Sequence, residues 1–123
     1  MWMIWRAYAE LLSLEYPLLR RNFSAVHDKV RNTHLRAPAR ENITPDQVCR
    51  AIDLAAALYL KQVLCLQRSA ATACLLKRHG YPAEMVIGVQ QLPFVAHAWV
   101  ELDGRVVNDK QYISEVYSVL TRC

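Results

Sequence analysis

In the first part of the chain, apolar side chains recur at spacings of three and four residues, which is the period of amphipathic helices. In residues 1–31 this pattern predicts two short helices separated near Pro17, because proline interrupts helical hydrogen bonding. Residues 32–43 are polar, contain Pro38 and lack periodicity, so they predict a linker. The front of the chain is therefore expected to be helical.

Two further helices are indicated by start and stop signals. The segment from Thr44 to Gln47 predicts a capping box at a helix start, and the apolar stripe that follows continues to about Lys61. A second helix is expected from Cys65 to His79, with Gly80 in the left-handed conformation that ends many helices. The side chains expected on its buried face are Leu66, Ala70, Ala73 and Leu76.

The last third of the chain changes to the alternation that is typical of strands. Residues 84–89 and 94–102 predict two strands joined by a loop at 90–93. Asp103-Gly104 is a turn signal, after which residues 105–109 predict a third strand. These segments together predict an antiparallel β-meander.

The end of the chain, residues 111–123, predicts a short helical segment, because three apolar residues are four apart: Tyr112, Val116 and Leu120. Helices followed by a meander predict an α+β domain. We expect a single domain over residues 1–123, with a helical N-terminal portion at 1–42 and a core at 43–123 that carries the chemistry.

The charge and apolar content exclude several classes of protein. Lys and Arg number 15 against 11 Asp and Glu, and no long block of like charges occurs, so no nucleic-acid partner is predicted. The longest clean apolar run, from Leu54 to Leu60, is far shorter than the ~20 residues of a membrane span. The N-terminus lacks the basic region of a secretory signal, which favours a cytoplasmic location.

The cysteines and histidines do not show the spacing of a metal site. No Cys-x-x-Cys pair occurs among Cys49, Cys65, Cys74 and Cys123, and the four histidines are scattered. Neither a zinc site nor a disulfide framework is predicted, and the chemistry considered below needs no metal and no organic cofactor.

Cys65 is the candidate nucleophile because it opens a predicted helix. A helix N-terminus carries partial positive charge and unpaired N–H groups, which favour a thiolate and can receive a developing oxyanion. Arg68, about one turn further on, adds positive charge. Cys49 and Cys74 are expected to be buried and inert. For Cys65 itself, the alternative is a small buried apolar residue without chemistry.

His97 lies in an otherwise apolar strand and is the candidate base. Glu101 on the same strand is about 13 Å away by the rise per residue, whereas Asp109 on the next strand can come within ~5 Å. We therefore predict that Asp109 orients His97, which completes a nucleophile, a base and an orienting group. Alternatively, His97 is a structural histidine. Trp99 either forms a wall of the site or fills the core.

The loop length at the turn decides which residue faces His97. A three-residue loop, Leu102 to Gly104, places Asp109 opposite His97, whereas a two-residue loop brings Asn108 to that side of the sheet. Because a carboxylate stabilises an imidazolium better than an amide does, we predict the three-residue loop. Gly104 is expected at positive φ, with Asp109 in hydrogen-bond reach of His97.

Several segments of the chain, which together span roughly residues 45–113, resemble lasso-peptide leader peptidases: Cys65 to Ser69, Arg78 to Gly80, Ile87 to Val89, Pro93 to Glu101 and Val107 to Asp109. These are small transglutaminase-like cysteine peptidases of ribosomal peptide biosynthesis. The resemblance implies a core like that of papain and the transglutaminases. It also implies that Cys65 is the nucleophile, His97 the base and Asp109 its partner.

The resemblance further implies removal of a leader from a precursor peptide, which prepares the peptide for an ATP-dependent cyclase. A chain this short looks like the stand-alone form, which works with a separate leader-binding protein. The basic, aromatic segment at residues 1–31 is expected to take part in docking. Two alternatives remain: a transglutaminase-type acyl transferase with the same three residues, and a non-catalytic module that docks the precursor.

Overall fold

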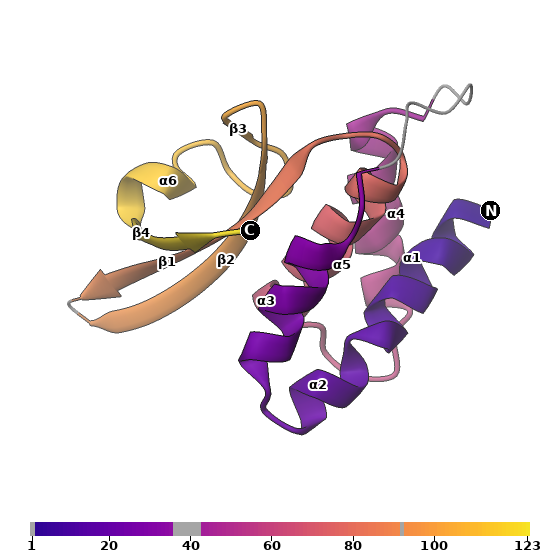
Figure 1. The fold of residues 1–123 in the computed structure, drawn as a ribbon, viewed down its shortest axis with the longest axis horizontal. Helices are drawn as coiled ribbons and strands as arrows, with labels where there is room; N and C mark the ends of the chain where they lie inside the picture. Colours follow the sequence, from indigo (N-terminus) through magenta and orange to yellow (C-terminus); the bar gives the residue numbers. More distant parts are fainter. Residues whose placement is uncertain (1, 36–42, 92) are drawn as a thin grey trace.

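The computed structural model describes residues 2–35, 43–91 and 93–123, and it confirms the predicted α+β class. A layer of helices packs against a four-stranded antiparallel sheet with strand order β3-β2-β1-β4 (Figure 1). The helices are α1 (Trp2–Ser13), α2 (Glu15–Leu19), α3 (Phe23–Asn32), α4 (Pro45–Ala57), α5 (Cys65–Arg78) and α6 (Ile113–Val116). The strands are β1 (Ala83–Gln91), β2 (Phe94–Leu102), β3 (Arg105–Val106) and β4 (Ser118–Arg122).

The N-terminal portion contains three helices, so the prediction of two helices separated near Pro17 is wrong. The breaks fall at Leu14 and after Leu19, whereas Pro17 lies in the first turn of α2. Proline is tolerated in a first turn because its missing N–H has no intrahelical partner there. Helix α3 then begins where the Asn22 side chain accepts a hydrogen bond from the Ala25 N–H at 3.1 Å. Most of the predicted linker, residues 36–42, lies outside the described residues.

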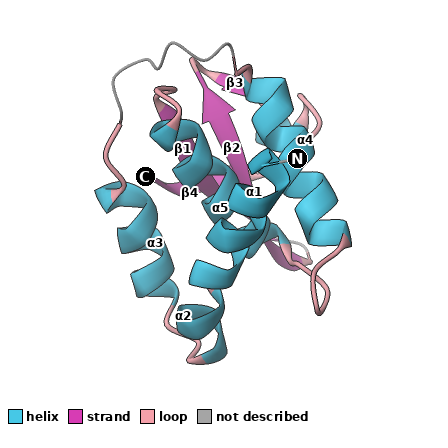
Figure 2. Ribbon diagram, turned by 90° about the vertical axis from the view of Figure 1, so that its right-hand side faces the viewer, coloured by secondary structure: helices cyan, strands magenta, loops and turns pink. Residues whose placement is uncertain are grey.

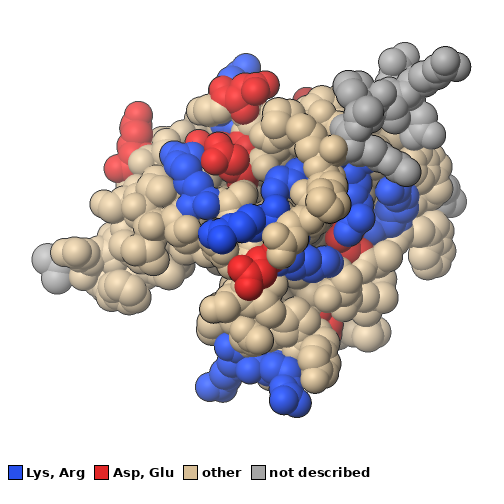
Figure 3. All heavy atoms as spheres, viewed as in Figure 1, with Lys and Arg blue, Asp and Glu red and all other residues tan. Residues whose placement is uncertain are grey.

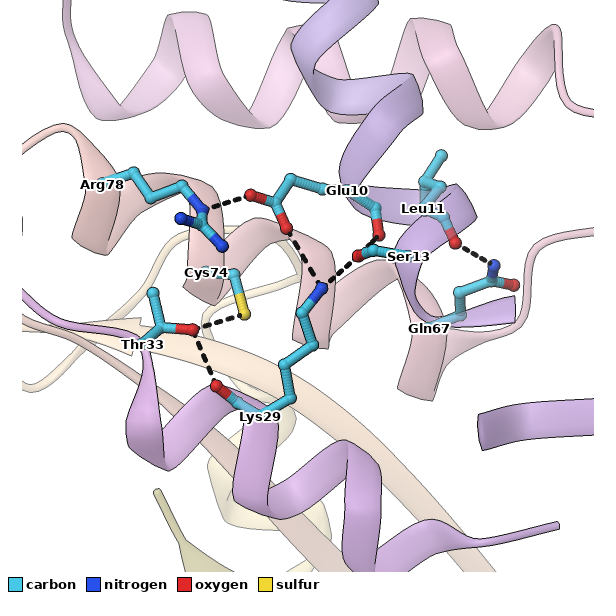
Figure 4. Close-up of polar contacts among 8 residues, drawn as sticks. All are labelled: Glu10, Leu11, Ser13, Lys29, Thr33, Gln67, Cys74 and Arg78. Atoms are coloured by element: carbon cyan, nitrogen blue, oxygen red, sulfur yellow. Dashed lines mark hydrogen bonds and ion pairs between the residues drawn. The ribbon is translucent and has the colours of Figure 1, made fainter. Parts of the chain in front are cut away.

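Partly buried polar contacts tie α1 and α3 to α5 (Figure 4). The carboxylate of Glu10 pairs with Arg78 and accepts a hydrogen bond from Lys29 at 3.4 Å. Gln67 donates to the Leu11 carbonyl at 2.9 Å. Since apolar residues of these helices also belong to one hydrophobic core, the N-terminal portion is an integral part of the helical layer.

Helix α4 confirms the predicted capping box. Thr44 Oγ1 accepts from the Gln47 N–H at 3.2 Å, and Gln47 Oε1 accepts from the Thr44 N–H at 2.9 Å. The helix ends at Ala57 instead of Lys61. Tyr59 nevertheless packs against the core and lies 5.1 Å from the Tyr8 ring, so the apolar stripe continues beyond the helical backbone.

Helix α5 lies between the other helices and the sheet (Figure 2). It begins at Cys65, as predicted, and ends at Arg78, one residue before the predicted end at His79, which is its C-cap. Gly80 has φ 89°, in the predicted left-handed conformation. Its residues from Ser69 to Leu76 are buried without interruption, because neighbours cover it on both sides. Among the helices that the structure describes, none is long and apolar enough to cross a membrane.

The sheet contains the predicted hairpin and one strand that was not predicted, but the predicted loop at 90–93 is too long, because β1 continues through Gln91. β1 and β2 pair along their whole length and project beyond the helical layer (Figure 1). The prediction of a helical segment over residues 111–123 is wrong, because helix α6 covers one turn and residues 118–122 form β4. β4 pairs with β1, whose edge would otherwise lack hydrogen-bond partners. Tertiary pairing therefore overrides the helical spacing.

The loop between β2 and β3 corrects the predicted register. Leu102 pairs with Arg105, so the loop contains two residues, and the predicted three-residue bulged loop is wrong. Asp103 and Gly104 have φ values of 53° and 78°, the combination that two-residue hairpin turns favour. The positive φ of Gly104 is confirmed. β3 ends at Val106, not at Asp109.

A second, smaller core covers the sheet face opposite α5. Trp99 is fully buried there with Val86 and Val106, and Ile113 and Tyr117 pack against them. Gly88 makes room for this arrangement: a Cβ at this position would lie 2.7 Å from Trp99 Cη2 and 2.9 Å from Tyr117 Cβ. The absence of a side chain at Gly88 thus allows Trp99 and Tyr117 to approach the sheet.

We expect Gly88→Ala to lower the free energy of unfolding by about 1–3 kcal/mol, because the added methyl overpacks a fully buried cluster. Chemical denaturation measures the loss, and near-UV circular dichroism should report the displaced Trp99. Gly104→Ala is the control for the spectrum: its φ of 78° makes an alanine strained, so it should also lower stability, but no atom lies within 4 Å of its Cβ position and the near-UV signal of Trp99 should not change. An unchanged near-UV spectrum for Gly88→Ala would contradict the prediction.

Candidate active site

Cys65 is the first residue of α5 and is half-buried. The N-cap residue, Leu64, has no side-chain acceptor for the N–H groups of the first turn. The first backbone hydrogen bond of the helix runs from the Arg68 N–H to the Leu64 carbonyl at 3.0 Å. The thiol therefore lies at the positive end of a 14-residue helix, where anionic groups are stabilised.

His97 and Asp109 form a direct hydrogen bond, as predicted. His97 Nε2 donates to Asp109 Oδ2 at 2.6 Å, and both side chains are about one quarter exposed. The other carboxylate oxygen, Oδ1, accepts from the Lys110 N–H at 2.8 Å. With its proton on Nε2, the neutral ring keeps Nδ1 as the nitrogen that can accept a proton.

The route by which Asp109 reaches His97 differs from the prediction. Strand pairing stops after Val107, which donates to the Val100 carbonyl at 3.0 Å. The Asn108 side chain then accepts from the Val100 N–H at 2.8 Å, the place where a backbone carbonyl would continue the ladder. The chain bends away from the sheet here, and this bend allows the next residue, Asp109, to meet His97.

Ser69 on α5 completes this connection. Asn108 Nδ2 donates to Ser69 Oγ at 3.1 Å, and Ser69 donates to the Ala98 carbonyl at 3.0 Å. Ser69 is only 1% exposed, so these bonds are shielded from water. They link the helix that carries Cys65, the strand that carries His97 and the loop that carries Asp109.

The ring of His97 rests on aromatic neighbours. It stacks on Tyr117 at 5.3 Å between centroids and on Trp99 at 6.1 Å. Trp99 is therefore a core residue that also supports the candidate base. Its indole N–H donates to Glu101 at 2.9 Å, so Glu101 does not contact His97.

Glu101 is itself held by charge and hydrogen bonds. Arg122 donates to Glu101 Oε1 at 2.8 Å. Burial raises the pKa of this carboxyl, but the hydrogen bonds from Arg122 and Trp99 outweigh burial and hold the pKa below its usual value. Glu101 is therefore an ionised structural residue that fixes the Trp99 indole.

Cys65, His97 and Ala98 line two adjoining cavities. The first, of about 200 Å³, has polar walls that include Arg68, Ser69, Asn108 and Asp109. The second, of about 310 Å³, has apolar walls formed by Phe23, Leu66, Ile87 and Ala96. The structure thus brings Cys65 and His97 to the same two cavities, with Asp109 on the polar side.

The other three cysteines are in environments that favour the neutral thiol. Burial, with a smaller effect from Asp53, raises the pKa of Cys49 to about 11. Burial also raises the pKa of Cys74, and it raises that of Cys123 to about 11. At neutral pH these thiols are poor nucleophiles, because the thiolate is the reactive form.

We expect iodoacetamide at pH 7 to modify Cys65 before any other cysteine. A thiol with a pKa of about 11 is ionised in only about one molecule in 10⁴ at this pH, and the ionised fraction rises tenfold per pH unit. Labelling of Cys123 should therefore become appreciable only near pH 10. Peptide mapping after brief labelling at several pH values measures the order. Modification of Cys49 or Cys123 before Cys65 at pH 7 would contradict it.

Within the described ranges, no three His, Cys, Asp or Glu side chains gather as a metal site requires. Sequence reasoning missed Asn108 as a connector, Tyr117 as a support for His97, and Phe23 as a wall of the apolar cavity. An Asn directly before the acidic residue was the one visible signal, since Asn often replaces backbone hydrogen bonds at bends.

Comparison with known proteins defines the class of this molecule. Residues 10–122 match the transglutaminase-like superfamily, and the chain belongs to that superfamily. Over 56 residues it is 39% identical to the microcin J25-processing protein McjB of Escherichia coli. This match covers 46% of the chain and 27% of McjB, so it spans little more than a quarter of that relative. No solved structure shows a significant match. The family resemblance predicted from the sequence is confirmed.

Proposed function

We propose that the protein is a cysteine peptidase that removes the leader from a ribosomally made lasso precursor peptide. The observation that carries the proposal is the 2.6 Å bond from His97 Nε2 to Asp109 Oδ2, beside cavities that His97 shares with Cys65. Similarity to a protein that processes microcin J25 supports a peptide precursor as the substrate.

The proposed reaction has two halves. In the first, Cys65 passes its thiol proton to His97 Nδ1, the thiolate attacks the carbonyl carbon between leader and core, and the carbonyl oxygen gains negative charge. The C–N bond then breaks to leave a thioester, and His97 gives the proton to the leaving amine. In the second, His97 takes a proton from water, the resulting hydroxide attacks the thioester, the C–S bond breaks to release the leader as a carboxylic acid, and His97 returns the proton to the Cys65 sulfur. Asp109 stabilises the imidazolium and fixes the ring orientation. The helix N-terminus at Cys65 favours both the thiolate and the oxyanion.

The proposal is tested with the precursor peptide, incubated with and without its leader-binding protein and analysed by mass spectrometry. We expect a free leader acid and a core peptide with a free N-terminus, and neither product with Cys65→Ala. In water enriched in ¹⁸O, the leader acid should gain one heavy oxygen. A folded Cys65→Ala protein that still cleaves the precursor would end the peptidase proposal.

Two other functions give different products. An acyl transferase with the same three residues would join the leader to an added primary amine, such as glycine methyl ester, through an amide bond. A docking module without chemistry would bind the precursor unchanged, and its Cys65 would not react preferentially with iodoacetamide. The half-buried thiol on two cavity walls favours the enzymatic functions.

The proposed partners are the precursor, a leader-binding protein and the ATP-dependent cyclase, all in the cytoplasm. Arg20 and Arg21 are exposed directly after α2. Figure 3, viewed as Figure 1, shows Lys and Arg side chains grouped at the lower edge of the molecule, where α2 lies. Such a surface suits an acidic partner or peptide segment.

We expect the double variant Arg20→Glu and Arg21→Glu to slow processing several-fold at low salt and less at 0.5 M salt, because salt screens exposed charges. Initial cleavage rates across ionic strength measure the effect. Arg50→Glu with Arg105→Glu is the control, since it changes the net charge equally at exposed positions outside residues 1–31. Equal rates for the Arg20/Arg21 variant and wild type at every ionic strength would exclude a docking role.

A further inference from the structure

The apolar cavity beside Cys65 has walls from four separate elements. Phe23 comes from α3, Leu66 from α5, Ile87 from β1, and Ala96 and Ala98 from β2. None of these five side chains carries a polar atom, so the cavity suits a hydrocarbon group. Its volume of about 310 Å³ leaves ample room for an apolar side chain of a peptide.

The polar cavity indicates how an acyl group at Cys65 would be oriented. Arg68 Nε is buried and has no hydrogen-bond partner among the described residues, and Arg68 lines the polar cavity. A carbonyl oxygen that becomes negatively charged is stabilised by positive charge, so it belongs on the polar side, where Arg68 and the N-terminus of α5 lie. The carbon chain of the same acyl group is then directed to the apolar side.

The edge of β2 next to the apolar cavity can pair with an extended peptide. Both backbone groups of Val100 are bonded on the β3 side, to Val107 and Asn108, and the Ala98 carbonyl on that side is bonded to Ser69. By the alternation of a strand, the backbone groups of Ala96 point the same way. Within the described part of the chain, β3 pairs only with residues 101–102, so the edge at Ala96 has no strand beside it.

We propose that the substrate adds to this edge as an extended strand and places one apolar side chain of its acyl portion in the cavity. The inference rests on the proposed function and deepens it. Ile87 and Ala98 face each other across β1 and β2, so the cavity opens on one face of the sheet. Because side chains of an added strand alternate between the two faces, one of the last two residues before the cleaved bond enters the cavity and the other does not.

The test uses two series of peptide chloromethyl ketones, acetyl-X-Gly and acetyl-Gly-X, with X as Gly, Ala, Leu or Asp. The thiolate of Cys65 displaces chloride and forms a thioether, and intact-mass spectrometry measures the rate. In one series we expect Leu to react about tenfold or more faster than Gly, and Asp to react more slowly than Gly. In the other series the rates should be similar.

Substitutions in the cavity wall locate the preference. Ala96→Leu places a larger side chain at an exposed wall position and should abolish the preference for Leu over Gly. Val95→Leu is the matched control, because Val95 neighbours Ala96 on the strand and faces the other side of the sheet. Phe23→Ala, which removes an exposed side chain, should reduce the preference.

The outcomes separate this inference from the proposed function. Equal rates for every X in both series, or an unchanged preference in Ala96→Leu, would overturn the apolar subsite even if the precursor is cleaved normally. A preference that Ala96→Leu removes, in a protein that does not hydrolyse the precursor, supports the subsite and refutes the peptidase proposal. A Cys65 that reacts with none of the reagents refutes both.

Discussion

Replacement of Cys65 by Ala is expected to reduce cleavage of the precursor by roughly 10⁴-fold or more, because the proposed nucleophile is lost and no thioester can form. His97→Ala should have a comparable effect, since the thiol and its base act as a unit. The double variant should then lose little beyond either single variant. Single-turnover cleavage followed by mass spectrometry measures all three rates.

The remaining cysteines supply the controls. Cys49→Ala and Cys74→Ala should retain cleavage, because both thiols are buried in the helical core, away from the two cavities. Either variant loses some packing, so thermal denaturation should accompany the assay. If Cys49→Ala lost activity while remaining folded, or Cys65→Ala retained it, the assignment of the nucleophile would be wrong.

The elements predicted best from the sequence are those whose signals are local. The capping box at Thr44, the start of α5 at Cys65 and the left-handed Gly80 depend on the chemistry of a few adjacent residues. The β1–β2 hairpin was also predictable, because alternation over nine residues of β2 is distinct from helical spacing. Local patterns and tertiary packing agree in these segments.

The elements predicted wrongly depend on partners far away in the chain. β4 forms because β1 has an edge to pair with, and its sequence alone has helical spacing. Pro17 lies in the first turn of α2. The sequence alone does not show this position, so Pro17 was interpreted as the end of a helix. Such choices are decided by tertiary contacts that a single sequence does not display.

The residues of the candidate site could be predicted from the sequence, but the backbone path that brings them together could not. The sequence predicted that Asp109 contacts His97, because Glu101 lies too far away along the same strand. The hydrogen bond between His97 and Asp109 is present. The predicted three-residue loop was nevertheless wrong, since it assumed that the strands stay paired as far as Asp109. The side chain of Asn108 ends the pairing instead, and a bend formed by a side chain has no periodic signature.

We expect Asn108→Ala to lower the rate of cleavage by about 10²-fold, although Asn108 is a positioning residue that takes no part in proton transfer. Its side chain joins the Val100 N–H to Ser69, and without it the bend that presents Asp109 loses both supports. A displacement of a catalytic group by about 1 Å is sufficient for a loss of this size. kcat should fall more than KM rises, because the cavity walls that hold the substrate are largely unchanged.

A merely structural role for Asn108 would lower stability without affecting the chemistry of His97. We therefore expect the pH profile of kcat to change in Asn108→Ala and to resemble that of Asp109→Asn, since both variants weaken the contact of His97 with a carboxylate. Ser69→Ala breaks the same connection at its other end. The increase in activation free energy in the double variant should therefore be smaller than the sum of the increases in Asn108→Ala and Ser69→Ala. A wild-type pH profile in a fully folded Asn108→Ala protein would show that Asp109 reaches His97 without this support.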